Sequence, residues 1–135
     1  MHKIILVTGP SNSGKTSSIR RFLENRGIFH KQDGDLAIVL PLQKNGKTYV
    51  VGIASGGDTL AIVQSNFVFF QPHNCDVIIC ASKSRGKTLA CITNHATQHG
   101  AVLSKTHTNY ANPANTSNIA LSINAIAAQI EQNFP

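Results

Sequence analysis

Residues 9–16 have the sequence GPSNSGKT, in which two glycines, a lysine and a threonine stand at a spacing that suits phosphate binding. Gly9 lets the chain turn, and the small residues after it allow backbone N–H groups to curl around an anion. A helix beginning after Gly14 would add the positive end of its dipole. Lys15 would then reach the β- and γ-phosphates of a nucleotide, and the hydroxyl of Thr16 would hold Mg²⁺. We expect Lys15 to face solvent when no nucleotide is bound.

A second stretch, ASKSRGKT at residues 81–88, has a similar pattern. Ala81 stands where the first stretch has a glycine, and its Cβ disfavours a positive φ. Lys83 and Arg85 replace small residues inside the loop. We therefore expect one nucleotide site, with Arg85 or Lys83 reaching the transferring phosphoryl group from the side. A solvated basic turn and a true second phosphate loop remain the alternatives.

An acidic partner for Mg²⁺ has few candidates, because the chain has six acids. Asp58 follows the apolar segment VVGIASGG, so it lies just beyond a strand end, and we choose it for the metal. Asp35 is the second choice, since the strand after Asp33 and Asp35 belongs to a hairpin and can bring them to either edge of a sheet. Asp76 precedes its strand and is expected at the opposite edge. An ordinary turn aspartate is the alternative for Asp58.

Two further groups of side chains have chemistry to offer. Cys91, His95 and His99 share one face of an expected helix, but three ligands over two turns lie too far apart for easy metal binding, so a half-exposed helix face is the simpler interpretation. His107 and Tyr110 follow the last expected strand and either border the phosphate loop or form an ordinary loop.

The apolar pattern predicts the elements that would position these residues. Apolar β-branched runs predict strands, and the pair Asn45–Gly46 predicts a hairpin turn between two of them. Apolar residues at helical spacing predict the helices. The last of them has one face formed by Ile119, Ile123, Ile126 and Ile130, with a cap at residue 115 or 116. The expected strands are 3–8, 35–42, 49–55, 76–82 and 101–107, and the expected helices are 15–27, 59–70, 86–100 and 116–133.

This order predicts one α/β domain over residues 1–135, with a mostly parallel sheet, an antiparallel hairpin strand and helices on both faces. Strands of a parallel sheet end at one edge, where ligands of such sheets bind. The loops after residues 8 and 82 should therefore be neighbours.

Over residues 4–24 the chain resembles the P-loop NTPase superfamily. The resemblance implies binding of ATP or GTP with Mg²⁺ and cleavage or transfer of the γ-phosphoryl group. The base-reading segment Asn-Lys-x-Asp of GTPases is missing, which favours ATP, and the Asp-Arg pair of nucleotide kinases is missing too. The expected nucleotide-binding residues are Gly9, Pro10, Ser11, Asn12, Ser13, Gly14, Lys15, Thr16 and Ser17. The expected catalytic residues are Lys15, Asp58 and Arg85, and the expected Mg²⁺ ligands are Thr16 and Asp58.

Two function classes follow from these residues. The first is a small ATP-dependent phosphotransferase, kinase-like, or an ATPase with an unknown acceptor. The second is a regulatory nucleotide-binding module with slow or no turnover that contacts nucleic acid, which the net charge of +6 also suits. No apolar run reaches the length of a membrane span, no signal peptide is visible, and three cysteines without paired spacing do not suggest disulfides, so we expect a cytoplasmic protein.

Overall fold

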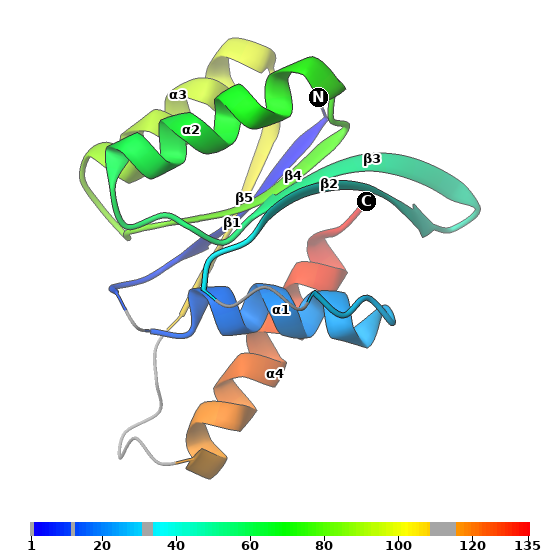
Figure 1. The fold of residues 1–135 in the computed structure, drawn as a ribbon, viewed down its shortest axis with the longest axis vertical. Coiled ribbons are helices and arrows are strands. Elements are labelled where there is room, and N and C mark those ends of the chain that lie inside the picture. The colour runs from blue at the N-terminus through cyan, green and yellow to red at the C-terminus, as the bar shows by residue number, and fades with distance from the viewer. Residues whose placement is uncertain (1, 12, 31–33, 109–115) are drawn as a thin grey trace.

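Two apolar segments, β1 (Lys3–Thr8) and β4 (Val77–Ser82), lie side by side in the middle of the sheet and run parallel (Figure 1). The computed structural model describes residues 2–11, 13–30, 34–108 and 116–135. Within these residues the sheet has five strands in the order β2-β3-β4-β1-β5. The other strands are β2 (Ala37–Lys44), β3 (Lys47–Ala54) and β5 (Val102–His107). The β2–β3 pair is antiparallel, and the pairs β3–β4, β4–β1 and β1–β5 are parallel.

Helices cover both faces of this sheet. Helices α2 and α3 lie together on one face, and α1 and α4 lie on the other (Figure 1). Their bounds are α1 (Lys15–Asn25), α2 (Leu60–Phe70), α3 (Lys87–His99) and α4 (Thr116–Asn133), with a short 3-10 helix, η1 (Gln71–His73), after α2. Thr59 caps α2 by accepting a hydrogen bond from the backbone N–H of Ile62 at 3.2 Å.

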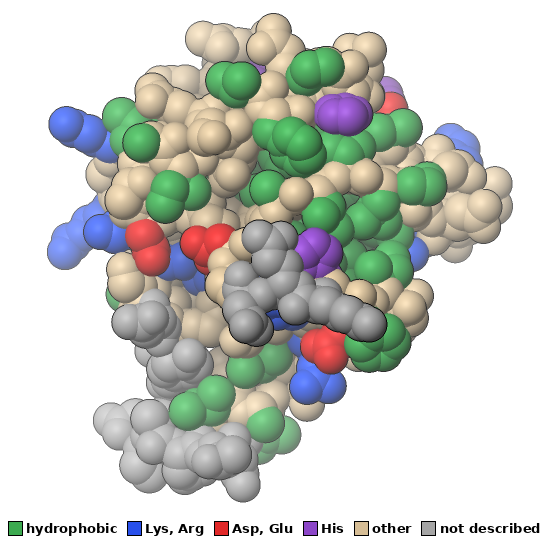
Figure 2. Space-filling model, viewed as in Figure 1, with side chains coloured by type: hydrophobic (Ala, Val, Ile, Leu, Met, Phe, Trp, Pro, Cys, Tyr) green, Lys and Arg blue, Asp and Glu red, His purple; other side chains and the backbone are tan. Residues whose placement is uncertain are grey.

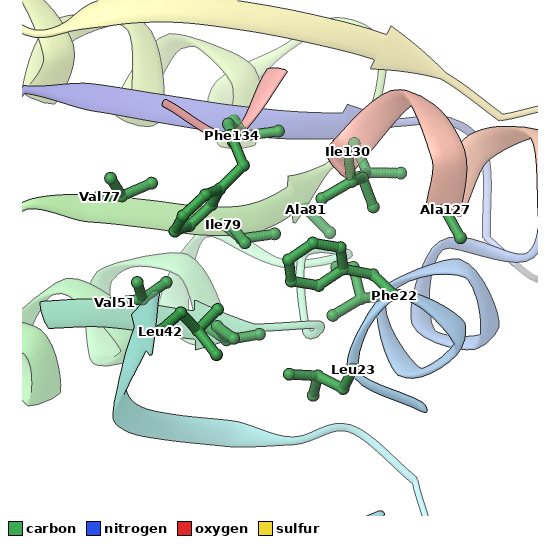
Figure 3. Packing of buried hydrophobic residues seen from close by; sticks show 14 of the residues in the cluster. Phe22, Leu23, Leu42, Val51, Val77, Ile79, Ala81, Ala127, Ile130 and Phe134 are labelled. Carbon is green, nitrogen blue, oxygen red and sulfur yellow. The ribbon is translucent and has the colours of Figure 1, made fainter. Parts of the chain in front are cut away.

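The four inner residues of β1, 4–7, are apolar because both faces of the strand are covered. Ile5 and Val7 pack in the cluster beneath α1 and α4, and Ile4 and Leu6 pack in the cluster beneath α2 and α3. All four side chains are inaccessible to solvent. In Figure 3 the ring of Phe22, from α1, projects into the first cluster near Ala81 and Leu23. Burial of each large apolar side chain contributes about 1.5–3 kcal/mol, which holds the central strand in place.

The β2–β3 hairpin turns at Asn45 and Gly46, which have φ values of 53° and 79°. Two successive positive φ values are those of a type I′ turn, whose twist matches the strands that it joins. Its register pairs Ala37 with Ala54. Asp35 therefore lies at the edge where β3 ends, one of the two positions that the sequence left open.

The far ends of α1 and α4 are held together by a bidentate ion pair. Arg26 donates through Nε and Nη2 to the two carboxylate oxygens of Glu131 at 2.8 and 2.7 Å. Its guanidinium group also lies 4.9 Å from the ring centre of Phe134. This ion pair lies at the opposite end of α1 from Lys15, so it joins the helix to α4 at a distance from Lys15.

The expected α/β architecture is confirmed in its main features: a mostly parallel sheet, one antiparallel hairpin pair, and helices on both faces. The expected cap at residue 115 lies outside the described residues. None of the helices in the described parts of the chain is both long enough and apolar enough to cross a bilayer.

Candidate functional site

The loop between β1 and α1 ends in a glycine with a backbone that few other residues adopt. Gly14 has φ 94° and ψ 14°, in the left-handed region, and as a glycine it has no side chain to cap the helix that it precedes. The first helical bond runs from Ser18 N to Gly14 O at 2.9 Å. The first turn of a helix leaves its N–H groups without helical partners, so the start of α1 offers donors and a positive dipole end to an anion. Asn12 lies outside the described residues.

Lys15 folds back into its own loop. Its Nζ donates to the carbonyl oxygens of Gly9 and Pro10 at 2.7 and 3.1 Å and to Oδ1 of Asp58 at 2.9 Å. Its side chain is only 6% exposed. The expectation that Lys15 faces solvent is therefore wrong, because an ammonium group has three donors and each of them finds an acceptor, two in the loop and one on Asp58.

Gly9 is required for a reason beyond the turn. A Cβ at this position would overlap the side-chain oxygens of Thr108 and Ser13. The Thr108 hydroxyl donates to Thr8 O at 3.1 Å, so Ser13 donates to Thr108 Oγ1 at 2.6 Å. Thr108 thus ties the loop to the end of β1. No spacing in the sequence points to Thr108, because the contact depends on β5 lying beside β1.

Asp35 contacts the residue expected to hold the metal. The hydroxyl of Thr16 donates to Asp35 Oδ1 at 2.9 Å, and the hydroxyl of Ser55 lies 3.4 Å from the same oxygen. Ser55 also accepts from the backbone N–H of Leu36 at 2.8 Å, which fixes the strand entry beside Asp35. The second-choice carboxylate is therefore the one that meets Thr16.

Asp58 enters the same pocket from the turn after β3, held by its ion pair with Lys15, and its side chain is 46% exposed. Gly57 allows this turn to press against the end of β4, since a Cβ there would overlap the backbone of Ala81 and Ser82. The pocket has a volume of about 320 Å³. Its lining is Ser13, Gly14, Lys15, Thr16, Ser17, Asp35, Ser55 and Asp58.

The polar atoms of this pocket fit Mg²⁺. A hydroxyl and two carboxylates are hard oxygen donors, and Mg²⁺ is usually bound through one or two carboxylates together with phosphate oxygens and water. Thr16, Asp35 and Asp58 would supply the protein's share of such a set.

The second loop has a different shape from the first. Thr8 pairs with Ser82 across the sheet, although the GKT motifs would align Thr8 with Cys80. Relative to its GKT motif, strand β4 therefore ends two residues later than β1 does. Four residues separate β4 from α3, whereas six separate β1 from α1. The shorter connection leaves less backbone to surround a phosphate.

The side chains of the second loop also differ from those of the first. Lys87 is exposed, unlike Lys15. Thr88 is buried, and its hydroxyl accepts from the backbone N–H of Lys83 at 3.2 Å. Arg85 is exposed, in the loop that follows the strand beside β1. Gly9 N donates to Ser82 O at 3.1 Å, so the two loops begin in direct contact.

The remaining candidates lie apart from the pocket or beside it. Asp76 accepts from Val50 N at 2.8 Å at the opposite edge, as expected. The rings of His95 and His99 are 4.3 Å apart, and no group of three His, Cys, Asp or Glu in the described residues could hold a metal. His107 Nδ1 lies 3.2 Å from Thr8 Oγ1, so it borders the start of the glycine-rich loop after β1. Tyr110 and Asp33 lie outside the described residues.

Charged side chains of both signs gather at this edge. Figure 2 shows basic (blue) and acidic (red) side chains close together at the left of the molecule, where Figure 1 has the strand ends that lead into α1, α2 and α3.

No family model matches this chain, and no curated protein matches it.

Proposed function

We propose that the chain is a P-loop nucleotide-binding protein that holds ATP with Mg²⁺ and hydrolyses it or transfers its γ-phosphoryl group. The observation that carries the proposal is the convergence at the start of α1. A buried ammonium group, a threonine hydroxyl, two carboxylates and a glycine-rich turn meet in one pocket. The turn follows β1, which lies between two parallel neighbours, where ligands of open α/β sheets bind.

The roles follow from the chemistry of each side chain. The N–H groups from Gly14 to Ser17 would bind the phosphates, and Lys15 would exchange Asp58 for a phosphate oxygen. Thr16 and Asp35, with Asp58, would hold Mg²⁺, which when bound neutralises phosphate charge and orients the γ-phosphoryl group. The absence of an Asn-Lys-x-Asp segment favours ATP over GTP.

Arg85 is the proposed cation for the transferring phosphoryl group. It stands on the loop after β4, and the last two residues of that strand lie against Gly9 and Gly57. A cation aimed at charge that develops during the reaction lowers the barrier more than it strengthens substrate binding.

A second candidate function is a slow nucleotide-binding module that contacts nucleic acid. It is supported by the exposed cations of the second loop and the start of α3, which are Lys83, Arg85 and Lys87.

Release of labelled phosphate from ATP, with and without candidate acceptors, tests the proposal. We expect Mg²⁺-dependent product formation that Lys15→Ala abolishes. Arg85→Ala should lower turnover at least tenfold with nearly unchanged ATP affinity, since arginine fingers contribute about 10³–10⁵-fold where they are well placed. Binding of ATP without turnover, together with salt-dependent binding of random RNA, would instead favour the second candidate.

A further inference from the structure

Arg20 holds the backbone that carries Asp35. It lies one helical turn after Thr16 on α1, so the two side chains share a face of the helix. Its Nη1 donates to the carbonyl oxygen of His30 at 3.0 Å, and its Nη2 donates to the carbonyl oxygen of Gly34 at 2.6 Å. Gly34 is the residue directly before Asp35. One side chain thus connects the helix that presents Thr16 to the segment that presents the carboxylate.

The segment needs such a connection because Asp35 itself is exposed. Gly34 has a φ of 77°, and apart from its chain neighbours no heavy atom of the described residues lies within 4 Å of the position where its Cβ would lie, so none of these residues holds it by packing. After Asp35, the chain is fixed by Leu36, which exchanges hydrogen bonds with Ser55 at 2.8 and 2.9 Å. Arg20 supplies the anchor on the other side of Asp35.

The guanidinium group suits this task better than an ammonium group would. Its planar fork fixes the directions of its N–H donors relative to one another. Two of them can therefore bind the carbonyl oxygens of His30 and Gly34 and fix their relative position. A carboxylate that must meet both Thr16 and a metal ion has to be held within about 0.5 Å of its working position.

We propose that Arg20 is a positioning residue for the metal-binding carboxylate: it holds the carbonyl groups of His30 and Gly34 so that Asp35 meets Thr16. The metal part of this inference rests on the proposed function. The positioning part concerns the chain alone and is measured without any ligand.

The test compares Arg20→Met with Arg21→Met, a matched control at the next, exposed position of α1. Amide hydrogen exchange at Leu36, whose N–H is bonded to Ser55, reports the anchoring in the ligand-free chain. We expect exchange at least tenfold faster in Arg20→Met and unchanged in Arg21→Met. Arg20→Lys, which keeps the charge but loses the fork, should be intermediate and serves if Arg20→Met does not fold.

Metal binding supplies the second readout. Titration of Mn²⁺ into the ATP complex, followed by electron paramagnetic resonance, should show affinity about 10-fold lower in Arg20→Met, the low end of losses for residues that orient metal ligands. ATP affinity without metal should stay within about twofold, because Lys15 and its loop are unchanged. Asp35→Asn should lose as much Mn²⁺ affinity, and the double variant no more than Asp35→Asn alone.

The outcomes separate the two claims. Unchanged Leu36 exchange in both Arg20→Met and Arg20→Lys would overturn the positioning role whether or not ATP binds. Faster Leu36 exchange in a chain that binds no ATP would support the positioning role and overturn the proposed function. Equal Mn²⁺ affinity in Arg20→Met and Arg21→Met, in chains that bind ATP, would overturn the metal part of the inference.

Discussion

Lys15 and Asp58 form a pair that has to separate before a phosphate can take the place of the carboxylate. All three donors of the Lys15 ammonium group are occupied, two by backbone carbonyls and one by Asp58. The carbonyls belong to the loop and remain in place, so Asp58 is the partner that a phosphate oxygen would replace. Because Asp58 is 46% exposed, the pair is worth about 0.2–1 kcal/mol, which a nucleotide can easily offset.

Asp58→Asn should therefore separate metal-free binding from turnover. Without Mg²⁺, we expect ATP affinity to rise about 1.5- to 5-fold, since the competing ion pair is gone. With Mg²⁺, turnover should fall at least tenfold, because a metal-binding carboxylate is lost. Calorimetric titration in a chelator and a phosphate-release assay measure the two effects.

Asp76→Asn provides the matched control for this variant, because Asp76 lies at the opposite edge of the sheet and its amide replacement can still accept from Val50 N. It should change neither quantity. Equal loss of affinity in Asp58→Asn with and without Mg²⁺ would contradict a metal role for Asp58 and leave Asp35 as the metal-binding carboxylate.

At the scale of elements, the two similar motifs differ in where the preceding strand ends. The two GKT motifs have the same spacing in the sequence, but β4 extends two residues farther into its motif than β1 does. The extra residues are Ala81 and Ser82, which pair with Val7 and Thr8 and support the turn that carries Asp58. The first two residues of the second motif therefore pack against the first loop and against the turn that carries Asp58.

This difference also shows what the sequence could reveal. The strands and helices were predictable because their apolar periodicity is strong, and the Asn45–Gly46 turn was predictable because its backbone favours those residues. Three features of the site were not predictable: the burial of Lys15, the contact between Thr16 and Asp35, and the contact between Ser13 and Thr108. Each of them depends on which strands become neighbours, and local propensity carries no information on that pairing.

Helices α2 and α3 meet through a histidine whose charge the packing disfavours. His95 stacks on Phe67 with ring centres 3.9 Å apart. Burial, and secondarily the nearby His99, lowers the pKa of His95 below its ordinary value of 6.5. Helix α2 contributes no titratable side chain to this contact. The unfolded chain therefore binds this proton more readily than the folded chain does.

The pH dependence of stability follows from that direction. The contribution of neutral His95 is fully present above about pH 6.5 and is lost as the pH falls toward its lower folded pKa. His95→Phe keeps a ring on Phe67 but removes the protonation. We expect its melting temperature to fall by a few degrees less than that of the wild type between pH 7.5 and 5.5.

His73→Gln, at a histidine in η1, is the control for the melting experiment and should retain the wild-type pH dependence. An equal drop in melting temperature for the wild type and His95→Phe would show that the α2–α3 contact does not respond to pH through His95.

At the scale of the whole molecule, the sheet order brings distant parts of the chain to one edge. The glycine-rich loop of residues 9–14 follows β1, Asp58 follows β3, the second loop follows β4, and Thr108 follows β5. The antiparallel β2 adds Asp35 to the same edge, because its start lies beside the end of β3. A chain with 12 Lys and Arg residues and 6 acids thus places two of its carboxylates in the pocket of Lys15, the one buried lysine among the residues that the structure describes.

The central claim is that this edge forms one ATP site, at the first loop. Equilibrium dialysis of ATP with Mg²⁺ at saturation tests it most directly, with Lys15→Ala and Lys87→Ala as a matched pair in the two GKT motifs. Both variants should remain folded, with Lys15→Ala the less stable by roughly 1–3 kcal/mol because it loses hydrogen bonds of a buried charged group. We predict one ATP per chain in the wild type, one in Lys87→Ala and none in Lys15→Ala. Two ATP per chain with one lost in Lys87→Ala, or unchanged binding in a folded Lys15→Ala, would contradict it.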